Sequence, residues 1–417
     1  MTERFNTMEK IRMGVIGLGQ RGFYNLNHYL AKYNDVDVCI VCDLYDDRLE
    51  RAAKDVMEQQ GKEPICTKDY REVLNKDLVD AVYIATSWET HIEISIASLR
   101  AGIITATEVG GAYTVEECYE LVKAYEETGT PFMFMENCCF NDQELLATAA
   151  VRAGKLGTVV HCSGAYAHDL RKEVSEGNIK RHYRLRNYLN RNCENYPTHE
   201  LGPIARLLNI TRGNRMVSLV SVATKACGLV EYVEENKIYE QDETLKNAKF
   251  KQGDIVNTII TCAGGETILL TLDTTLPRSY NRDLKVRGTK GLYEMATNSF
   301  FLDGMKEQWR TVQYYTGCMD NAKEYYQELM PEVWLNMTEE DKKSGHGGMD
   351  GVMFRTFVEA VKSGSPLPID VYDAASWMCV TALSEASIAQ GGAVQQIPDF
   401  TAGKWLIRAP EDVMKLC

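Results

Sequence analysis

The sequence has no excess of basic residues and no long apolar run. Its 46 Lys and Arg are outnumbered by 59 Asp and Glu, and the formal net charge of -13 repels nucleic-acid phosphates and anionic lipids. No stretch stays apolar for the roughly 18 residues that a membrane helix needs. The opening residues, MTERFNTMEK, contain no apolar signal core. We therefore expect a cytoplasmic protein with no nucleic-acid or membrane partner.

A disulfide framework is not indicated either. The 417 residues, 45% apolar and 25% charged, have the composition of a globular protein with two or three domains. Thirteen scattered cysteines, an odd number, are typical of reduced thiols. Cys39 and Cys42 form the only CxxC, but they lie in a predicted strand, where positions three apart point to opposite faces. No metal site is expected.

What the sequence does contain, up to about residue 135, is an alternation of apolar runs and helical patterns. Segments such as VDVCIVCD and DAVYIAT, each followed by a helical pattern, predict a parallel, doubly wound Rossmann sheet, an α/β fold. Later runs such as MVSLVSVATKA and ETILLTLDTTLP predict a mostly antiparallel open sheet in an α+β domain. The expected domains are residues 1–135 and 136–417, with a polar, loop-rich insert at 169–194. Helical patterns around FRTFVEAVKSG and AASWMCVTALSEASIAQGG would cover the second sheet or pack back on the first domain.

The glycine motif GLGQRG at residues 17–22 follows an apolar strand and opens a helix. Its glycines let the backbone approach a pyrophosphate, and Asp43, at the end of the next strand, would accept ribose hydroxyls and repel a 2′-phosphate. This context predicts NAD as the cofactor, although Arg48 nearby would favour a phosphate. The alternative is a glycine-rich turn with Asp43 as a solvated strand end. The candidate cofactor-binding residues are Gly17, Gly19, Gln20, Arg21, Gly22, Asp43, Ser87, Trp88, His91, Glu108 and Asn137.

The segment TSWETH at residues 86–91 follows another predicted parallel strand, at the edge where open α/β sheets place ligands. Trp88 would wall the ribose and nicotinamide, or else pack on the domain as an aromatic residue at a helix start. His91, in the first helical turn, is more typical of a structural residue than of a catalyst.

A nicotinamide-binding domain followed by an antiparallel α+β domain resembles the Gfo/Idh/MocA oxidoreductases, which oxidise sugars or polyols. In that family a strand usually ends in Glu-Lys-Pro, and the lysine assists hydride transfer. The corresponding residues here are Glu108, Val109 and Gly110. Because the lysine is missing, the resemblance does not imply the common dehydrogenase mechanism.

Five further motifs, taken together, are similar to those of glycoside hydrolase family 109. They are MENCCF at 135–140, GAYAHDLR at 164–171, YPTHELGP at 196–203, PRSY at 277–280 and HGGMD at 346–350. Family 109 is known for NAD-dependent glycosidases, chiefly those that remove α-linked N-acetylgalactosamine. The resemblance implies NAD as cofactor, a glycoside or sugar as substrate, and a homo-oligomer, either a dimer or a tetramer.

By position, the resemblance implies four catalytic residues: Glu136, Tyr166, His199 and Tyr280. NAD-dependent glycosidases are an exception to the two-carboxylate mechanism. The sugar is oxidised at C3, the aglycone leaves by C1–C2 elimination, water adds, and C3 is reduced again. His199 would handle the C3 hydroxyl, Tyr166 would be the C2 base, and Tyr280 would assist the leaving group. Glu136 would orient the sugar or tune His199, and exchanges of role among the four remain open.

Four more residues are candidate substrate ligands: Tyr196, Glu200, His346 and Asp350. Glu200 stands where members of the family often have glycine, which indicates a part in substrate choice. His346 lies among glycines in a loop expected to close over the sugar, and Asp350 would bind its hydroxyls. Two other functions remain open: a plain NAD-dependent sugar dehydrogenase, and a sugar sensor without turnover. The sugar, its anomer and the aglycone are not determined by the sequence.

Overall fold

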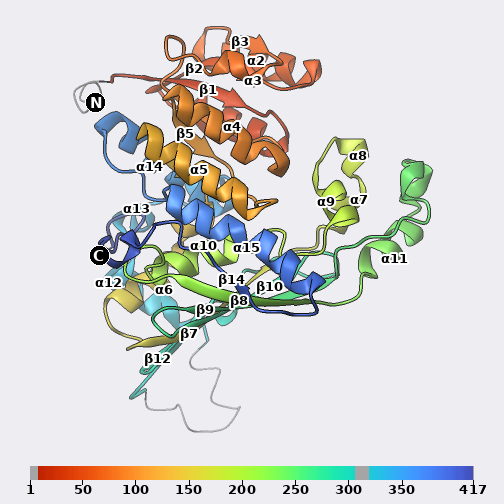
Figure 1. Ribbon diagram of the computed structural model, residues 1–417. Coiled ribbons are helices and arrows are strands. Elements are labelled where there is room, and N and C mark those ends of the chain that lie inside the picture. Colours follow the sequence, from red (N-terminus) through yellow and green to blue (C-terminus); the bar gives the residue numbers. More distant parts are fainter. Residues whose placement is uncertain (1–7, 306–318, 417) are drawn as a thin grey trace. The chain divides into compact units, whose positions relative to one another are not determined.

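The computed structural model describes residues 8–305 and 319–416, and the chain divides into two compact units (Figure 1). The first comprises the described residues of Met1–Glu136 together with Lys342–Ala375. The second comprises the described residues of Asn137–Asp341 and Ser376–Cys417. The expected lack of a signal core concerns the opening residues MTERFNTMEK. Of these, residues 1–7 lie outside the described residues. Nowhere in the described part of the chain is a helix long and apolar enough to cross a membrane.

The first unit is built on a six-stranded sheet in the order β3-β2-β1-β4-β5-β6, in which every neighbouring pair is parallel. This is the strand order of dinucleotide-binding folds, so the Rossmann prediction is confirmed. The central strands are buried along almost their whole length, because helices cover both faces of a parallel sheet. The strands are β1 (Ile11–Ile16), β2 (Val36–Cys42), β3 (Ile65–Thr67), β4 (Ala81–Ile84), β5 (Ile104–Thr107) and β6 (Phe132–Phe134).

Helices connect these strands, and α4 and α5 pack side by side (Figure 1). A capping box starts α5: the Thr114 hydroxyl accepts from the Glu117 amide, and the Glu117 carboxylate accepts from the Thr114 amide. The helices are α1 (Gln20–Asn25), the π-helix η1 (Leu26–Leu30), α2 (Asp46–Gln60), α3 (Tyr70–Val73), α4 (Trp88–Ala101), α5 (Val115–Thr128), the 3-10 helix η9 (His346–Gly348), α14 (Met349–Ser363) and the first turn of α15 (Val371–Ala389).

A late segment of the chain returns to complete the first unit. Phe354 of α14 stacks on Tyr29 with ring centroids 5.5 Å apart and meets the edge of Tyr83 at 5.2 Å. At the sheet edge, the Phe134 amide donates to the Ile369 carbonyl at 2.9 Å. The helical pattern around FRTFVEAVKSG therefore packs on the first unit, and α15 begins there and continues into the second.

The second unit contains an eight-stranded sheet in the order β13-β12-β11-β7-β10-β9-β8-β14. Only the β7–β10 pair is parallel in the described residues, so the prediction of a mostly antiparallel sheet is confirmed. Along β9, Val256 and Ile260 are fully buried whereas Ile259 is exposed, which is the alternation of a sheet covered on one face. The strands are β7 (Val159–Ala167), β8 (Met216–Ala223), β9 (Ile255–Cys262), β10 (Thr267–Asp273), β11 (Lys285–Gly288), β12 (Gly291–Glu294), β13 (Ser299–Leu302) and β14 (Gln395–Gln396).

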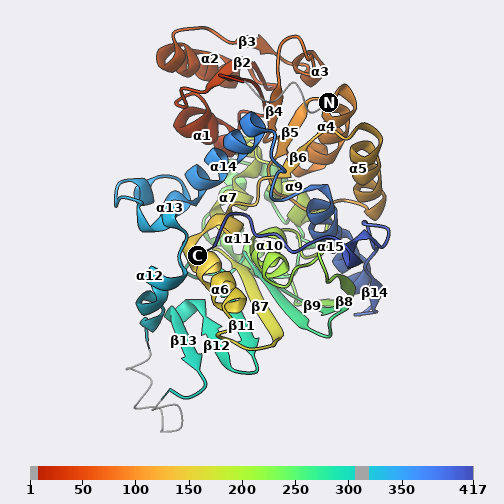
Figure 2. The ribbon, with the colours of Figure 1, turned by 90° about the vertical axis from the view of Figure 1, so that its left-hand side faces the viewer.

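Helices α6 and α10 pack together, and α10 lies on β7 and β10 (Figure 2). The α-helices of this unit are α6 (Asp142–Arg152), α7 (Arg171–Ser175), α8 (Gly177–Lys180), α9 (Arg184–Asn190), α10 (Thr198–Leu207), α11 (Gly228–Glu235), α12 (Tyr326–Leu329), α13 (Glu332–Leu335) and the rest of α15. The 3-10 helices are η2 (Asn137–Phe140), η3 (Ile238–Glu240), η4 (Glu243–Leu245), η5 (Met295–Thr297), η7 (Asn321–Tyr325), η8 (Asp341–Lys343) and η10 (Lys404–Leu406). The expectation of a loop-rich insert at 169–194 was wrong. Three short helices form there, because buried residues such as Leu185 and Tyr188 anchor them to the core.

Candidate active site

The glycine-rich turn after β1 has the geometry that a dinucleotide requires. Gly17 has a φ of +93°, and a Cβ there would lie 2.5 Å from the Ala85 carbonyl oxygen. At Gly22 a Cβ would lie 2.0 Å from the Gly17 carbonyl oxygen, so this glycine serves the packing of the turn. A Cβ at Gly19, by contrast, would meet no atom closer than an Arg48 nitrogen at 3.7 Å. The turn is therefore closed towards the protein and open at Gly19, where a pyrophosphate can approach.

Asp43 is held in place at the end of β2 by the same turn. Its Oδ2 accepts from the Leu18 amide at 2.7 Å, and its Oδ1 accepts from the Tyr45 amide at 3.1 Å. Arg48 lies 3.4 Å from Oδ2, so its charge is paired with this carboxylate. A fixed carboxylate at this position suits ribose hydroxyls, and the residues present fit NAD.

Arg21, in the same motif, forms a buried ionic network. Its two terminal nitrogens donate to both oxygens of Asp350 at 2.6 and 2.9 Å, and its Nε donates to Glu108 at 3.0 Å. Tyr83 also donates to Glu108, at 2.7 Å, and the half-exposed His346 lies 2.7 Å from Asp350. Burial alone would raise the pKa of Asp350, but Arg21 and His346 outweigh it and hold that pKa well below its usual range. These contacts tie His346 and Asp350 to the cofactor-binding unit.

The segment after β4 is packed into the same unit. Ser87 is the N-cap residue of α4, and Trp88, only 4% exposed, lies against Gly110, where a Cβ would be 2.5 Å from the indole ring. The glycine at position 110 thus leaves room for the Trp88 ring. The His91 Nε2 lies 3.1 Å from the Thr86 carbonyl oxygen, and burial lowers the pKa of this histidine to about 4. His91 is therefore a neutral residue that fixes the start of α4.

Three of the predicted residues gather in a ring cluster within the second unit. The ring centroids of Tyr166 and Tyr196 are 4.7 Å apart, those of Tyr196 and His199 are 4.7 Å apart, and those of Tyr166 and His199 are 5.4 Å apart. All three are buried. Tyr166 lies on β7, Tyr196 lies in the loop just before α10, and His199 lies in α10. The sequence thus brings a histidine and two phenols into one protected group.

The cluster extends to Tyr280 through His168. The Nδ1 of His168 is 3.4 Å from the Tyr166 hydroxyl, and its ring centroid is 5.0 Å from that of Tyr280. Burial raises the pKa of Tyr166 to about 12, although Arg184 opposes the rise. Burial, followed by the charge of Arg184, lowers the pKa of His168, so this imidazole is neutral at neutral pH.

His199 and Glu200 occupy the first turn of α10, a helix interrupted by Pro203. Proline has no amide hydrogen, so the helical bond that would join residue 203 to the His199 carbonyl is missing. Glu200 is 2% exposed, and its Cβ would lie 3.0 Å from a Cβ at Gly164. The glycine in GAYAH therefore makes room for α10 on β7 and sets how close His199 comes to Tyr166.

Several polar residues of this unit are not predicted from the sequence. Arg184 lies in the segment that was expected to be a loop, and its guanidinium carbon is 5.0 Å from the centroid of the Tyr196 ring. Arg282 and Glu144 form a buried ion pair, and Arg282 donates to the Tyr280 hydroxyl at 3.1 Å. Glu194 is fully buried just before YPTH, and burial raises the pKa of its carboxyl to about 8. The only available signal was their proximity in sequence to the motifs.

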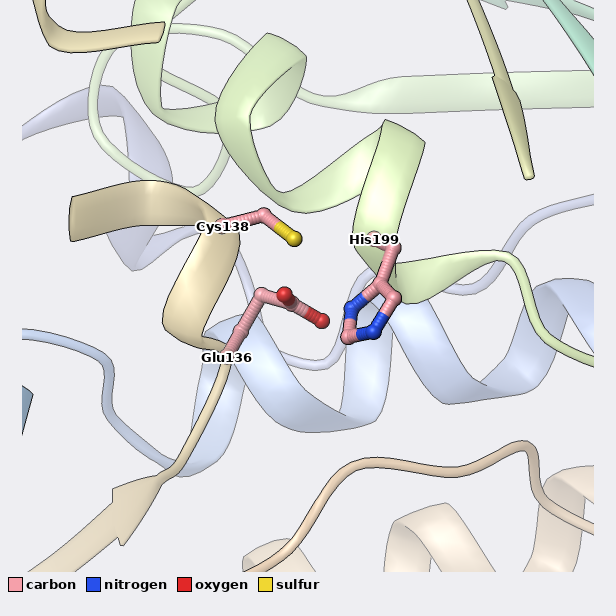
Figure 3. A group of neighbouring side chains, drawn as sticks. All are labelled: Glu136, Cys138 and His199. Carbon is pink, nitrogen blue, oxygen red and sulfur yellow. The ribbon is translucent and has the colours of Figure 1, made fainter. Parts of the chain in front are cut away.

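Figure 3 shows the side chains of Glu136, Cys138 and His199, which point toward one another. Their carboxylate, thiol and imidazole atoms lie within 4.8 Å of one another. Glu136 follows β6, and Cys138 belongs to η2, where its thiol lies 3.6 Å from the side-chain oxygen of Asn137. Carboxylate, thiol and imidazole groups are also the donor types that occur at zinc sites.

The fold and the glycine turn define the class of protein. A family model described as "Oxidoreductase family, NAD-binding Rossmann fold", of the Gfo/Idh/MocA group, matches residues 11–135. The model "Glycosyl hydrolase 109, C-terminal domain" matches residues 140–407. The chain belongs to glycosyl hydrolase family 109.

Named relatives cover nearly the whole chain. An "Alpha-N-acetylgalactosaminidase" of Tannerella forsythia is 35% identical over 96% of this chain and 88% of its own length. A "Glycosyl hydrolase family 109 protein" of Stenotrophomonas maltophilia is 36% identical over 96% of this chain and 91% of its own. A further "Alpha-N-acetylgalactosaminidase", from Shewanella oneidensis, is 33% identical over 95% of this chain and 86% of its own.

Solved structures share the fold at much lower identity. Levoglucosan dehydrogenase in complex with NADH and levoglucosan has a TM-score of 0.67 at 18% identity, covering 93% of this chain and 100% of its own. The apo scyllo-inositol dehydrogenase of Lactobacillus casei has a TM-score of 0.65 at 14% identity, covering 94% of this chain and 99% of its own. At such identities the likeness establishes the fold alone.

Proposed function

We propose that this chain is an NAD-dependent glycoside hydrolase that cleaves α-linked N-acetylgalactosaminides. The observation that carries the proposal is the ring cluster of the second unit, in which His199, Tyr166 and Tyr280 gather around Tyr196 and His168. An acid–base set of this kind is unnecessary in a sensor. The relatives from Tannerella forsythia and Shewanella oneidensis bear the name of the proposed activity, which supports the choice of sugar.

The first unit would hold the cofactor through the open backbone at Gly19 and the fixed carboxylate of Asp43. When bound, NAD supplies a reversible oxidation of the sugar at C3, which makes the proton on C2 acidic. The residue that handles the C3 hydroxyl cannot be the lysine of the common dehydrogenases, because Val109 stands in its place. We assign that proton to His199, because an imidazole nitrogen can accept a proton from a hydroxyl and return it.

Tyr166 is the proposed base for the C2 proton. With a pKa of about 12 it is a neutral phenol at neutral pH, so it must lose its own proton before it can act. The His168 nitrogen, 3.4 Å from the Tyr166 hydroxyl, would accept that proton, although its lowered pKa makes it a weak base. Arg184, whose charge lowers the pKa of Tyr166, would favour the phenolate.

Tyr280 is the proposed proton donor to the glycosidic oxygen. Its phenol is protonated at neutral pH, and loss of hydration raises its pKa further. Glu136 would orient the sugar and tune His199, while Tyr196 and Glu200 would contact the substrate. His346 and Asp350 would act through the cofactor unit, given their ties to Arg21.

One assay tests the reaction. The enzyme and NAD are incubated in deuterated water with nitrophenyl α- and β-glycosides, including the N-acetylgalactosaminides. Release of nitrophenol, deuterium at C2 of the sugar and no accumulation of NADH are the expected results. Stoichiometric NADH without nitrophenol would contradict the proposal and favour a sugar dehydrogenase, and binding without either product would favour a sensor.

We also propose a cytoplasmic homo-oligomer in which residues 1–135 bind the cofactor and 136–417 bind the sugar. The thirteen scattered cysteines of the sequence, an odd number, support a reducing compartment. The outer face of the second sheet exposes Val222 and Ile259, each 53% accessible, which supports pairing of that face. Light scattering should give the mass of a dimer or tetramer, and cell fractionation should place the protein in the cytoplasm. A monomer or an exported protein would contradict these assignments.

A further inference from the structure

Behind Tyr280 lies a buried ion pair that the mechanism above does not use. The Nε of Arg282 bonds to one carboxylate oxygen of Glu144 on α6, and both side chains are less than a tenth exposed. The remaining Nη1 of Arg282 donates to the Tyr280 hydroxyl oxygen at 3.1 Å. The three groups therefore form one chain that runs from the core of the unit to the phenol.

The linked side chains of Glu144, Arg282 and Tyr280 are held in place at both ends. The second oxygen of Glu144 accepts from the Asn141 side-chain amide, which also lies at the start of α6. The Arg282 carbonyl accepts from the Ala165 amide at 2.6 Å, next to Tyr166 on β7. Asn281 and Ala167 exchange two backbone hydrogen bonds, at 2.9 and 3.1 Å. Tyr280 and Arg282 are thus fixed relative to the strand that carries the proposed C2 base.

The direction of the Arg282 bond matters for the proton of Tyr280. A guanidinium can only donate, so the Tyr280 oxygen acts as the acceptor and its own hydrogen must point to a different acceptor. A positive charge next to the oxygen also stabilises the phenolate that forms when the hydrogen leaves. Consistently, Arg282 lowers the pKa of Tyr280, against the rise caused by loss of hydration.

We propose that Arg282, held by Glu144, is a positioning residue that prepares Tyr280 to donate its proton to the leaving oxygen. The inference rests on the proposed function. As the C2–H electron pair forms the C1–C2 double bond, the C1–O bond breaks and its electron pair goes to the aglycone oxygen. That oxygen takes the Tyr280 proton and leaves as an alcohol. When water then adds at C1, the proton it releases returns to Tyr280.

A series of substrates whose leaving groups differ in pKa distinguishes this role from a merely structural one. The conservative variants Arg282→Lys and Glu144→Gln are compared with the wild-type enzyme on aryl α-N-acetylgalactosaminides of rising phenol pKa and on the methyl glycoside. Proton donation matters little for nitrophenol and greatly for methanol. We expect kcat/KM to fall less than about tenfold for nitrophenol and more than about a hundredfold for methanol, the range of general acid catalysis.

Arg152→Lys is the matched control. Arg152 lies at the other end of α6 and pairs with Asp412 at 2.9 Å, away from the proposed proton path. In the Arg152→Lys variant, kcat/KM should fall by the same small factor, or not at all, with every leaving group. If kcat/KM of Arg282→Lys or of Glu144→Gln fell by the same factor with every leaving group, the proposal would be overturned.

A second measurement keeps the proposal open to refutation if a variant folds poorly. In a Tyr280→Phe background the proton donor is absent, so adding Glu144→Gln should cause no further selective loss with the methyl glycoside. Independent, additive losses would show that the pair does not act through Tyr280. If the wild-type enzyme releases no nitrophenol at all, the proposed function fails, which is a different outcome from a flat leaving-group profile.

Discussion

The two units treat their buried polar groups in different ways. In the first, charges neutralise one another: Arg21 lies between the carboxylates of Glu108 and Asp350, and the backbone at Gly19 is left to face a ligand. In the second, apart from the ion pair of Arg282 and Glu144, the titratable groups of the ring cluster contact other aromatic rings, as His199 does with Tyr166 and Tyr196. Fixed charge suits binding, whereas the phenols and imidazoles of the ring cluster can exchange protons. The comparison predicts that changes in the first unit alter affinity and stability, and that changes in the second alter turnover.

The largest effect is expected from His199→Ala. Loss of the group that handles the C3 hydroxyl should lower kcat/KM by about a thousandfold, as is typical of a general acid–base residue. The dissociation constant for NAD, measured by calorimetry, should stay within about twofold. His161→Ala on β7 is the control, since His161 bonds to Thr267 outside the cluster. A parallel loss of NAD affinity in His199→Ala would break the division between the units.

Asp350→Asn should chiefly cost stability. Removing one carboxylate from a buried pair leaves Arg21 under-compensated, and we expect a loss of about 3 kcal/mol in the free energy of unfolding at pH 7. Because the folded-state pKa of Asp350 is depressed, its contribution is present above its unfolded pKa and is lost as the pH falls through the folded value. The difference between wild type and variant in urea denaturation should therefore shrink on acidification.

His346→Gln is the companion variant. The His346 side chain is 51% exposed, so its pair with Asp350 should contribute less than about 1 kcal/mol. A raised KM for the glycoside in folded Asp350→Asn protein, with NAD affinity unchanged, would instead assign this segment to the sugar.

A pair of glycine variants distinguishes ligand space from packing in the cofactor turn. Gly19→Val fills open space, so the protein should fold with an unchanged melting temperature while its affinity for NAD falls at least about tenfold. Gly22→Val would bring a Cβ to 2.0 Å from a backbone oxygen and should destabilise the fold itself. Equal NAD affinity in Gly19→Val and wild type would place the pyrophosphate elsewhere.

The smallest effect concerns Glu194, whose carboxyl is protonated up to a pKa of about 8 in the fold. A raised folded-state pKa means that the folded protein binds the proton more tightly, so stability falls as the pH rises from the unfolded pKa, near 4.3, towards 8. Glu194→Gln keeps a neutral side chain and should therefore be more stable than wild type at pH 8. The two proteins should converge at pH 5 in thermal unfolding, and a constant difference would argue against the shift.

The cofactor site of the first unit could be predicted from the sequence because its residues lie close together along the chain. Residues 17–22 and Asp43, at the end of β2, lie within one β-α-β unit. The glycines themselves indicate a tight turn that a ligand can approach closely. The parallel sheet follows from the alternation of strands and helices. The contacts of Trp88 and Arg21 could not be predicted, because they depend on Gly110 and on Asp350, far along the chain.

The candidate site of the second unit could be predicted only through motifs. Tyr166, His199 and Tyr280 were identified by resemblance, whereas no periodicity indicates that their segments meet. His168 and Arg184 were missed as participants because nothing in a single sequence distinguishes a buried histidine or arginine from an exposed one. The helices at 171–190 were missed for a related reason: they are short, and their buried residues are too few to set a period.

The path of the chain between the units limits how the protein can be divided. It passes from one unit to the other after Glu136, after Asp341 and again within α15. A fragment ending at residue 136 would contain every strand of the Rossmann sheet and lack Phe354, which stacks on Tyr29, and Ile369, which bonds to β6. Exchange of modules between relatives therefore requires three splice points rather than one, and a chimera joined only at the first would carry one parent's sheet beneath the other parent's α14.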